Sequence, residues 1–175
     1  MSFLDSILGV FYGKDRPLTL SARIPLGVEG REPPGPPPGL QESRDLCHLD
    51  KDLCERYLRL KADFRSQTGH ELFETCTYRG PETQAKLFEV GRRGVEGERK
   101  LTNCDGTTIK SRHNLYPSRA VDVAVDVDPG PGKTVVWSEH AYAALGPLCQ
   151  KHSLVWGGSW TIKDFPHIEL PRRVA

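Results

Sequence analysis

Two histidines and two aspartates stand in strongly patterned surroundings in the second half of the chain. His113 lies nine residues before Asp122 in "SRHNLYPSRAVDV", and Asp164 lies three residues before His167 in "DFPHIEL". Two imidazoles and one carboxylate, from His113, Asp122 and His167, are a set typical of catalytic zinc sites, which keep a fourth position open for water. Zinc lowers the pKa of such a water towards neutrality, and a general base must stand close to it. Asp164 is the candidate for this base.

The segment "AVDVAVDV" (residues 120–127) must position the first carboxylate. Alternation predicts a strand whose valines all face the core. The opposite face carries Ala120, Asp122, Ala124 and Asp126. Asp122 then stands between two small residues, as on the floor of a cleft, although an ordinary polar outer face is the alternative. In "HIEL" (residues 167–170) the same alternation separates the apolar Ile168 and Leu170 from His167 and Glu169.

The remaining pattern predicts helices around these strands. Apolar residues recur at helical spacing over residues 46–67, and "ELFETCTYR" (residues 71–79) alternates as a strand. A second helix is expected in "GPETQAKLFEVGRRG", with Pro81 in its first turn. A third is expected in "SEHAYAALGPLCQKH", with Ser138 as its N-cap and Pro147 as a kink or an early stop. This order predicts an α+β fold with a mainly antiparallel sheet and packed helices.

Composition excludes several classes of function. The 175 residues carry a net charge of +1, which gives no reason to expect a nucleic acid or an acidic polymer as partner. No apolar run approaches the roughly 20 residues that span a bilayer.

The five cysteines are odd in number and form no CxxC pair. Most of them are therefore interpreted as small buried hydrophobes in a reducing compartment, and the set is not interpreted as a disulfide framework or a cysteine-built zinc knuckle.

Residues 1–40 differ in character from the rest. Apolar residues between Phe3 and Phe11 share one helical face, which predicts a short amphipathic helix: a strap on the domain, or a weak contact with a membrane surface or a partner. "EGREPPGPPPGL" reads as a polyproline linker. We therefore expect a functional domain over residues 41–175. The N-terminus lacks the basic region of a signal peptide, so a cytoplasmic protein is expected.

Two linked stretches, "SRHNLYPSRAVDV" and "WGGSWTIKDFPHIEL", carry a family resemblance. They resemble the zinc peptidases of the D-Ala-D-Ala carboxypeptidase group, which share a fold with lysostaphin-type enzymes and the hedgehog signalling domain. Within this group the chain is most similar to phage L-alanyl-D-glutamate endopeptidases, the endolysins that cut peptidoglycan stem peptides. The resemblance covers roughly residues 46–171 and implies a zinc domain of the hedgehog/DD-peptidase type.

The resemblance also implies roles for individual residues. His113, Asp122 and His167 match the ligands of one catalytic zinc ion, and Asp164 matches the acid/base. "TYRGPETQ" is similar to the family's Y-R-S-x-x-x-Q stretch, which makes Arg79 the cation that holds the substrate and the developing oxyanion. It makes Gln84 a supporting residue. The chain departs from the family in two places: Gly80 replaces the usual serine, and the spacing from His113 to Asp122 is two residues longer than in familiar members.

Four neighbouring residues have less definite roles. Ser111 and Glu169 are expected to orient the ligands, and a solvent-facing side chain is the alternative for Glu169. Trp160, with Trp156, could wall the substrate groove, although Trp156 could equally be core.

The expected protein is thus a monomeric zinc peptidase acting on a peptidoglycan stem peptide. As an endolysin it would stay in the host cytoplasm and reach the cell wall once the membrane is permeabilised. A D,D-carboxypeptidase or dipeptidase on the same scaffold is the nearest alternative. A non-catalytic zinc- or peptidoglycan-binding module and a virion-associated module are the others.

Overall fold

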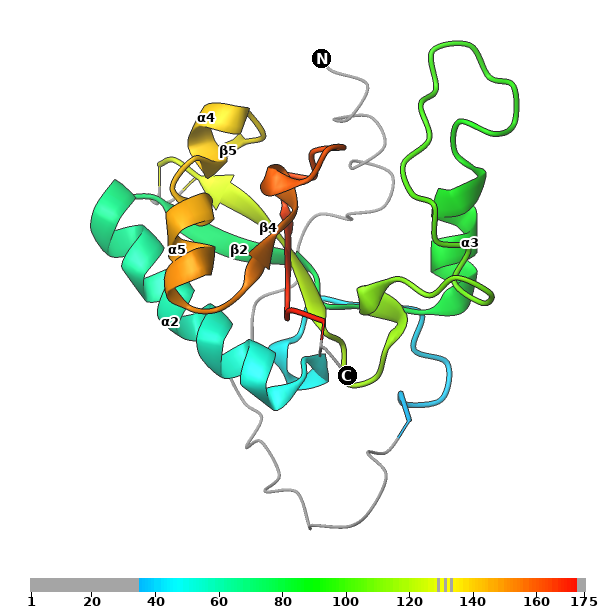
Figure 1. Ribbon diagram of the computed structural model, residues 1–175, viewed down its shortest axis with the longest axis horizontal. Coiled ribbons are helices and arrows are strands. Elements are labelled where there is room, and N and C mark those ends of the chain that lie inside the picture. Colours follow the sequence, from blue (N-terminus) through cyan, green and yellow to red (C-terminus); the bar gives the residue numbers. More distant parts are fainter. Residues whose placement is uncertain (1–34, 129, 131, 133, 173–175) are drawn as a thin grey trace. The chain divides into compact units, whose positions relative to one another are not determined.

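The computed structural model describes residues 35–128, 130, 132 and 134–172. The helix expected near the N-terminus and most of the proline-rich segment lie outside these residues, so the domain boundary near Leu40 stays a prediction. The described part is an α+β structure with antiparallel sheets, as the sequence predicts (Figure 1). Its helices, by chain order, are η1 (Leu46–His48), α2 (Lys51–Thr68), α3 (Pro81–Glu89), η2 (Arg112–Asn114), α4 (Glu139–Tyr142), α5 (Leu145–Lys151) and η3 (Gly157–Ser159).

A mixed set of long and short strands forms two sheets. The strands are β1 (Glu42–Ser43), β2 (Glu71–Cys76), β3 (Tyr78–Arg79), β4 (Ala120–Asp126), β5 (Val135–Val136), β6 (Val155–Trp156) and β7 (His167–Glu169). The larger sheet has the order β2-β4-β7-β6, with β5 also paired to β4, and β1 pairs with β3 in the smaller one. Every strand pair is antiparallel. The long strand β4 therefore lies at the centre of the larger sheet.

The core lies on the valine face of β4. Val121, Val123 and Val125 are fully buried there and pack with residues of α2 and α5, which lie side by side in Figure 1. Burying a side chain of this size contributes about 1.5–3 kcal/mol. The same cluster includes Ile168 and Leu170. Because both strands turn their apolar residues to this core, their other face is left for polar side chains.

Helix α2 is shorter at its start than predicted. The periodic segment begins with the separate turn η1, and α2 itself starts only after Asp50, whose side chain accepts a hydrogen bond from the Asp52 N–H. Gly69 ends α2 in the left-handed conformation, at φ 74°, which glycine adopts without steric strain. Pro81 occupies the first turn of α3, as expected.

The single helix expected over residues 138–152 is instead two short helices, α4 and α5. Pro147 lies in the first turn of α5, where its missing N–H is not needed. A continuous helix would require that N–H to bond the Ala143 carbonyl, and the proline ring would clash with it. Ser138 precedes α4 but makes no capping hydrogen bond with its side chain.

No helix among the described residues is both long and apolar enough to cross a membrane.

Candidate metal centre and active site

The polar face of the sheet carries a row of three side chains on three neighbouring strands. Asp122 of β4 is paired with His167 of β7 on one side and with Cys76 of β2 on the other. Directly paired residues of antiparallel strands project to the same face with their Cβ atoms about 4.5–5.5 Å apart. The register between β2 and β4 shifts by one residue between Glu74 and Cys76. Such a bulge re-aims a side chain, and here it brings Cys76 opposite Asp122.

His113 reaches this row from outside the sheet. It lies in the short turn η2, whose N-cap is Ser111. The Ser111 hydroxyl accepts a hydrogen bond from the His113 N–H at 3.3 Å, and the Asn114 side chain accepts one from the Ser111 N–H at 2.8 Å. Ser111 thus holds the backbone of the turn and does not contact the imidazole ring. Asn114 also donates to the Arg79 carbonyl at 2.6 Å, which fixes the turn to β3.

Three ligand-type atoms meet at one point. The distances are 3.1 Å from His113 Nε2 to Asp122 Oδ1, 3.0 Å from His167 Nδ1 to Asp122 Oδ1, and 3.3 Å from His113 Nε2 to His167 Nδ1. Ligands about 2.0–2.1 Å from a tetrahedral zinc ion stand about 3.3 Å from one another. The donor set and its spacing therefore fit a zinc ion. Sequence reasoning predicted these three residues, and the structure brings them together.

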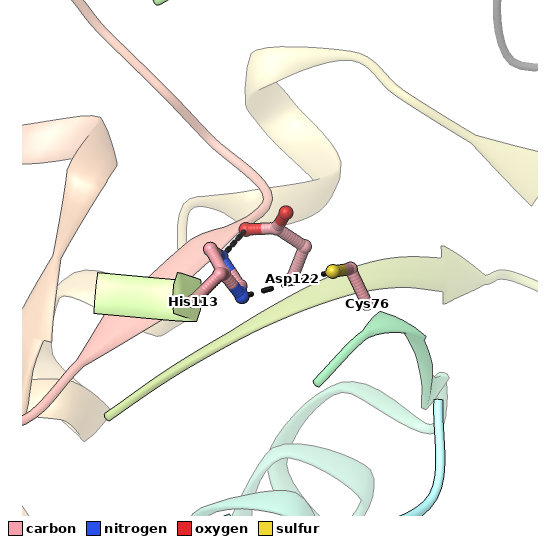
Figure 2. A group of neighbouring side chains, drawn as sticks. All are labelled: Cys76, His113 and Asp122. Atoms are coloured by element: carbon pink, nitrogen blue, oxygen red, sulfur yellow. Dashed lines mark hydrogen bonds and ion pairs between the residues drawn. The ribbon is translucent and has the colours of Figure 1, made fainter. Parts of the chain in front are cut away.

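Cys76 is a neighbour that sequence reasoning did not assign to the site. Cys76, His113 and Asp122 offer ligand atoms within 4.8 Å of one another. Figure 2 shows that the two ring nitrogens of His113 face different partners. Nδ1 lies 3.7 Å from the Cys76 sulfur, whereas Nε2 faces Asp122. Burial raises the pKa of the Cys76 thiol to about 12, so without an ion this side chain is a neutral thiol. Cys76 faces Nδ1, whereas Asp122 and His167 both face Nε2, so the set on the Nε2 side is the better metal site.

The carbonyl of Thr77 completes the surroundings of His113. It lies 3.3 Å from Nδ1, the nitrogen that faces away from Asp122. A hydrogen bond from Nδ1–H to this carbonyl leaves the lone pair on Nε2, as metal binding requires. Burial lowers the pKa of His113, which also favours its neutral form.

The charges of the cluster are coupled. Burial would raise the pKa of Asp122, but His113 and His167 hold it well below its ordinary value. Burial would lower the pKa of His167, but hydrogen bonds to Asp122 and Glu169 raise it to about 10. In the absence of a cation, this arrangement keeps a proton on His167 and a negative charge on Asp122. A divalent cation can replace that proton.

Arg79 and Gln84 lie beside the cluster, as the resemblance implied. Arg79 Nη2 is 3.1 Å from Asp122 Oδ2, and Arg79 Nη1 is 3.4 Å from Gln84 Oε1. The Gln84 amide donates to the Cys104 carbonyl at 2.9 Å and to Thr102 Oγ1 at 3.3 Å. Gln84 is buried. Through these hydrogen bonds it links the segment that follows α3 to the guanidinium of Arg79. Gly80, which replaces the family's serine, begins α3 without a side-chain cap.

Asp164 and Trp160 are held by a tight turn. The Gly157 carbonyl accepts hydrogen bonds from the N–H groups of both Trp160 and Asp164, and the Asp164 carbonyl accepts one from the His167 N–H. Asp164 is exposed, yet desolvation by neighbouring atoms and the negative charge of Asp122 raise the pKa of its carboxyl to about 6. The Trp160 ring lies 5.0 Å from that of His167 and is 38% exposed. Both side chains can therefore meet a substrate.

Glu169 contacts the site through His167. Its Oε2 lies 3.1 Å from His167 Nε2, so the alternative of a solvent-facing residue does not hold, and Glu169 is buried. The other oxygen, Oε1, lies 3.7 Å from Nε of Arg112. Arg112 was missed from the sequence, because nothing in its local pattern indicates which acid it approaches. Trp156 packs against the core and donates from Nε1 to the Phe165 carbonyl at 2.8 Å, as the core alternative expected.

Comparison with known families gives a class for this arrangement. A family model described as D-alanyl-D-alanine carboxypeptidase matches residues 105–170. That range contains His113, Asp122, Asp164 and His167, and it leaves out Arg79. No curated protein matches the chain. The match supports a peptidase of the D-alanyl-D-alanine carboxypeptidase type.

Among solved structures, the chain is similar to the L-Ala D-Glu endopeptidase ChiX of Serratia marcescens. The two are 25% identical, the similarity covers 72% of this chain and 83% of that one, and the TM-score is 0.50. This neighbour supports the same class of peptidase and has the same α+β fold.

Proposed function

We propose that this protein is a zinc-dependent peptidoglycan peptidase that cleaves stem peptides between L-Ala and D-Glu. The observation that carries the proposal is the meeting of His113 Nε2, His167 Nδ1 and Asp122 Oδ1 within 3.3 Å of one another, beside Asp164 and Arg79. The family match supports a peptidase, and the endopeptidase activity in the name of the structural neighbour supports the choice of bond.

The residues divide the work of hydrolysis among them. His113, Asp122 and His167 would hold the zinc ion, which when bound acidifies a water and polarises the scissile carbonyl. Asp164 accepts the proton of the attacking water as the water oxygen bonds to the carbonyl carbon. Arg79 stabilises the negative charge that develops on the carbonyl oxygen. Asp164 then delivers the proton to the leaving nitrogen as the C–N bond breaks.

Mass spectrometry of digested muropeptides tests the proposal. The zinc-loaded protein should leave L-Ala on the glycan and release peptides that begin with D-Glu. Asp164→Asn should bind zinc normally but lower kcat/KM about 10²–10⁴-fold. Asp128→Asn, a change at an exposed carboxylate after the end of β4, is the matched control and should stay active. Wild-type protein that binds no zinc, or an Asp164→Asn variant with full activity, would contradict the mechanism.

A D,D-carboxypeptidase is the second candidate, because the matching family model carries that description. The same digestion separates the two activities. Loss of terminal D-Ala, with the L-Ala–D-Glu bond intact, would establish the carboxypeptidase and contradict the endopeptidase.

The biological setting that we propose is that of a phage endolysin, which stays in the cytoplasm of its host until the membrane is permeabilised and then acts on the cell wall. The support is the likeness of "SRHNLYPSRAVDV" to the corresponding stretch of phage enzymes. Expression in a host cytoplasm should cause lysis only when a pore-forming protein is expressed as well. Recovery of the protein from purified virus particles would favour a virion-associated module instead. Zinc binding without any cleavage of peptidoglycan would indicate a non-catalytic module.

A further inference from the structure

A chain of contacts leads from His167 away from the metal centre. The Nδ1 atom of His167 faces Asp122 and His113, while its Nε2 atom lies 3.1 Å from Glu169 Oε2. A hydrogen bond from Nε2–H to Glu169 leaves the lone pair on Nδ1 and fixes the plane of the ring. The position of the Glu169 carboxylate therefore determines how His167 presents its ligand atom.

Glu169 is a nearly buried acid that needs a counter-charge. Its side chain is 11% exposed, and its second oxygen lies 3.7 Å from Arg112 Nε. This distance suits an ion pair but is too long for a direct hydrogen bond. A buried carboxylate is stable only when it is paired. Arg112 is the cation that the structure places against this oxygen.

Arg112 is itself fixed from several directions. Its Nη2 atom donates to the Leu170 carbonyl at 2.8 Å and lies 3.3 Å from the Pro171 carbonyl. Its own carbonyl accepts a hydrogen bond from the Arg119 N–H at 3.1 Å. Arg112 also directly precedes His113 in η2. The short turn η2 thus carries both His113 and the cation that lies beside Glu169, the residue that contacts His167.

We propose that Arg112 is a positioning residue of the metal centre, acting on His167 through Glu169. The inference rests on the proposed zinc site. Without the guanidinium, the Glu169 carboxylate loses its charge partner and no longer holds the ring of His167 in one orientation. Loss of a partner that orients a metal ligand typically weakens metal affinity about 10–100-fold.

A double-mutant cycle on zinc affinity tests this role. The dissociation constant for Zn²⁺ is measured by chelator competition on metal-stripped full-length protein for wild type, R112Q, E169Q and the double variant. Each single change should raise the constant about 10–100-fold. The double variant should have a dissociation constant no higher than that of the single variant that binds zinc less tightly, because both changes break the same chain of contacts.

Arg56 supplies a matched control. It is also a half-buried arginine that pairs with an acid, Asp52, and donates to a backbone carbonyl, that of Ser153 at 3.0 Å. R56Q should lower the melting temperature without changing zinc affinity. If R112Q does not fold, R112M replaces it in the same cycle, because methionine removes the charge but keeps an apolar stem of similar length.

The outcomes separate the two proposals. Wild-type affinity in R112Q, or independent losses that multiply in the double variant, would overturn the role of Arg112 while leaving the zinc peptidase intact. A wild-type protein without affinity for zinc would overturn both.

Discussion

The acids of the site differ in their surroundings, and this difference assigns their roles. Asp122 lies between His113 and His167 and beside Arg79, so its pKa is held well below the ordinary value. Desolvation, together with the negative charge of Asp122, raises the pKa of Asp164 to about 6. Environments that push the pKa values of two carboxyls apart are typical of acid/base sites. Asp122 therefore suits a permanent ligand, and Asp164 suits a group that gains and loses a proton.

The raised pKa of Asp164 predicts an acid limb in the pH profile. The carboxyl is protonated below pH about 6 and then cannot accept a proton from water. A bound cation opposes this rise and lowers the pKa of Asp164, so kcat/KM should begin to fall at or below pH 6 and drop about tenfold for each pH unit below that point. Kinetics on a muropeptide, with zinc content measured at each pH, check this. An acid limb centred above pH 7 would contradict the assignment.

Arg79 gives a second prediction for a single residue. Arg79→Met should lower kcat/KM about 10²–10³-fold, since a cation near the developing oxyanion is lost. Zinc should still bind, because the Asp122 oxygen that faces both histidines is Oδ1 and not the Oδ2 that Arg79 contacts. Arg65→Met, which breaks the surface pair with Glu71, is the control and should keep full activity. Equal activity of the two variants would exclude Arg79 from catalysis.

Individual elements supply the rigid frame for these side chains. The central strand β4 divides its residues between a core face and a polar face, and its pairing with β7 brings Asp122 directly opposite His167. The turn η3 then returns the chain so that the Gly157 carbonyl bonds two N–H groups, those of Trp160 and Asp164. Gly157 is packed so closely that a Cβ atom would stand 2.5 Å from the Asp164 carbonyl and 3.0 Å from the Cβ of His167.

Gly157→Ala should therefore damage both stability and the site. Such overpacking typically destabilises a protein by about 1–3 kcal/mol, and the displaced turn carries Asp164 and His167 with it. We expect a lower melting temperature, weaker zinc binding and lower kcat/KM. Gly130→Ala is the control, because the nearest atom to its added Cβ is 3.4 Å away. A Gly157→Ala protein with wild-type zinc affinity would show that the turn does not position the site.

The metal centre joins segments that are distant along the whole chain. His113 comes from the turn before β4, Asp122 from the centre of the sheet and His167 from β7. Without an ion, a half-buried carboxylate and two buried imidazoles face one another at hydrogen-bonding distance. A ligand that binds only the folded state stabilises the molecule in proportion to the logarithm of its concentration over Kd.

Zinc should accordingly raise the melting temperature of the whole domain. At a free zinc concentration 1,000 times Kd, the free energy of unfolding should increase by about 4 kcal/mol. Thermal denaturation of metal-stripped protein, with and without added zinc, measures the effect. His113→Ala should abolish most of the shift, whereas His140→Ala, at an exposed histidine of α4, should leave it unchanged. No shift in the wild type would contradict a zinc site formed by these residues.

Local pattern predicted much of the fold. The alternation of residues 120–127 separated the valines from Asp122, and helical spacing located α2, because both periodicities act between near neighbours in the chain. Local pattern predicted the wrong element bounds where a steric or long-range effect set them. Pro147 divided the third helix into α4 and α5. The strand expected over residues 71–79 is divided at Thr77 into β2 and β3.

The sequence by itself therefore determined the residue types of the site and the face of the strand from which Asp122 and His167 project. It could not determine their register, because hydrogen bonds between strands 45 residues apart set which residues stand opposite each other. Only the tertiary structure placed Cys76 beside His113, through a bulge, and Arg112 against Glu169. These contacts depend on where distant segments meet in space, and no spacing along the chain encodes that meeting.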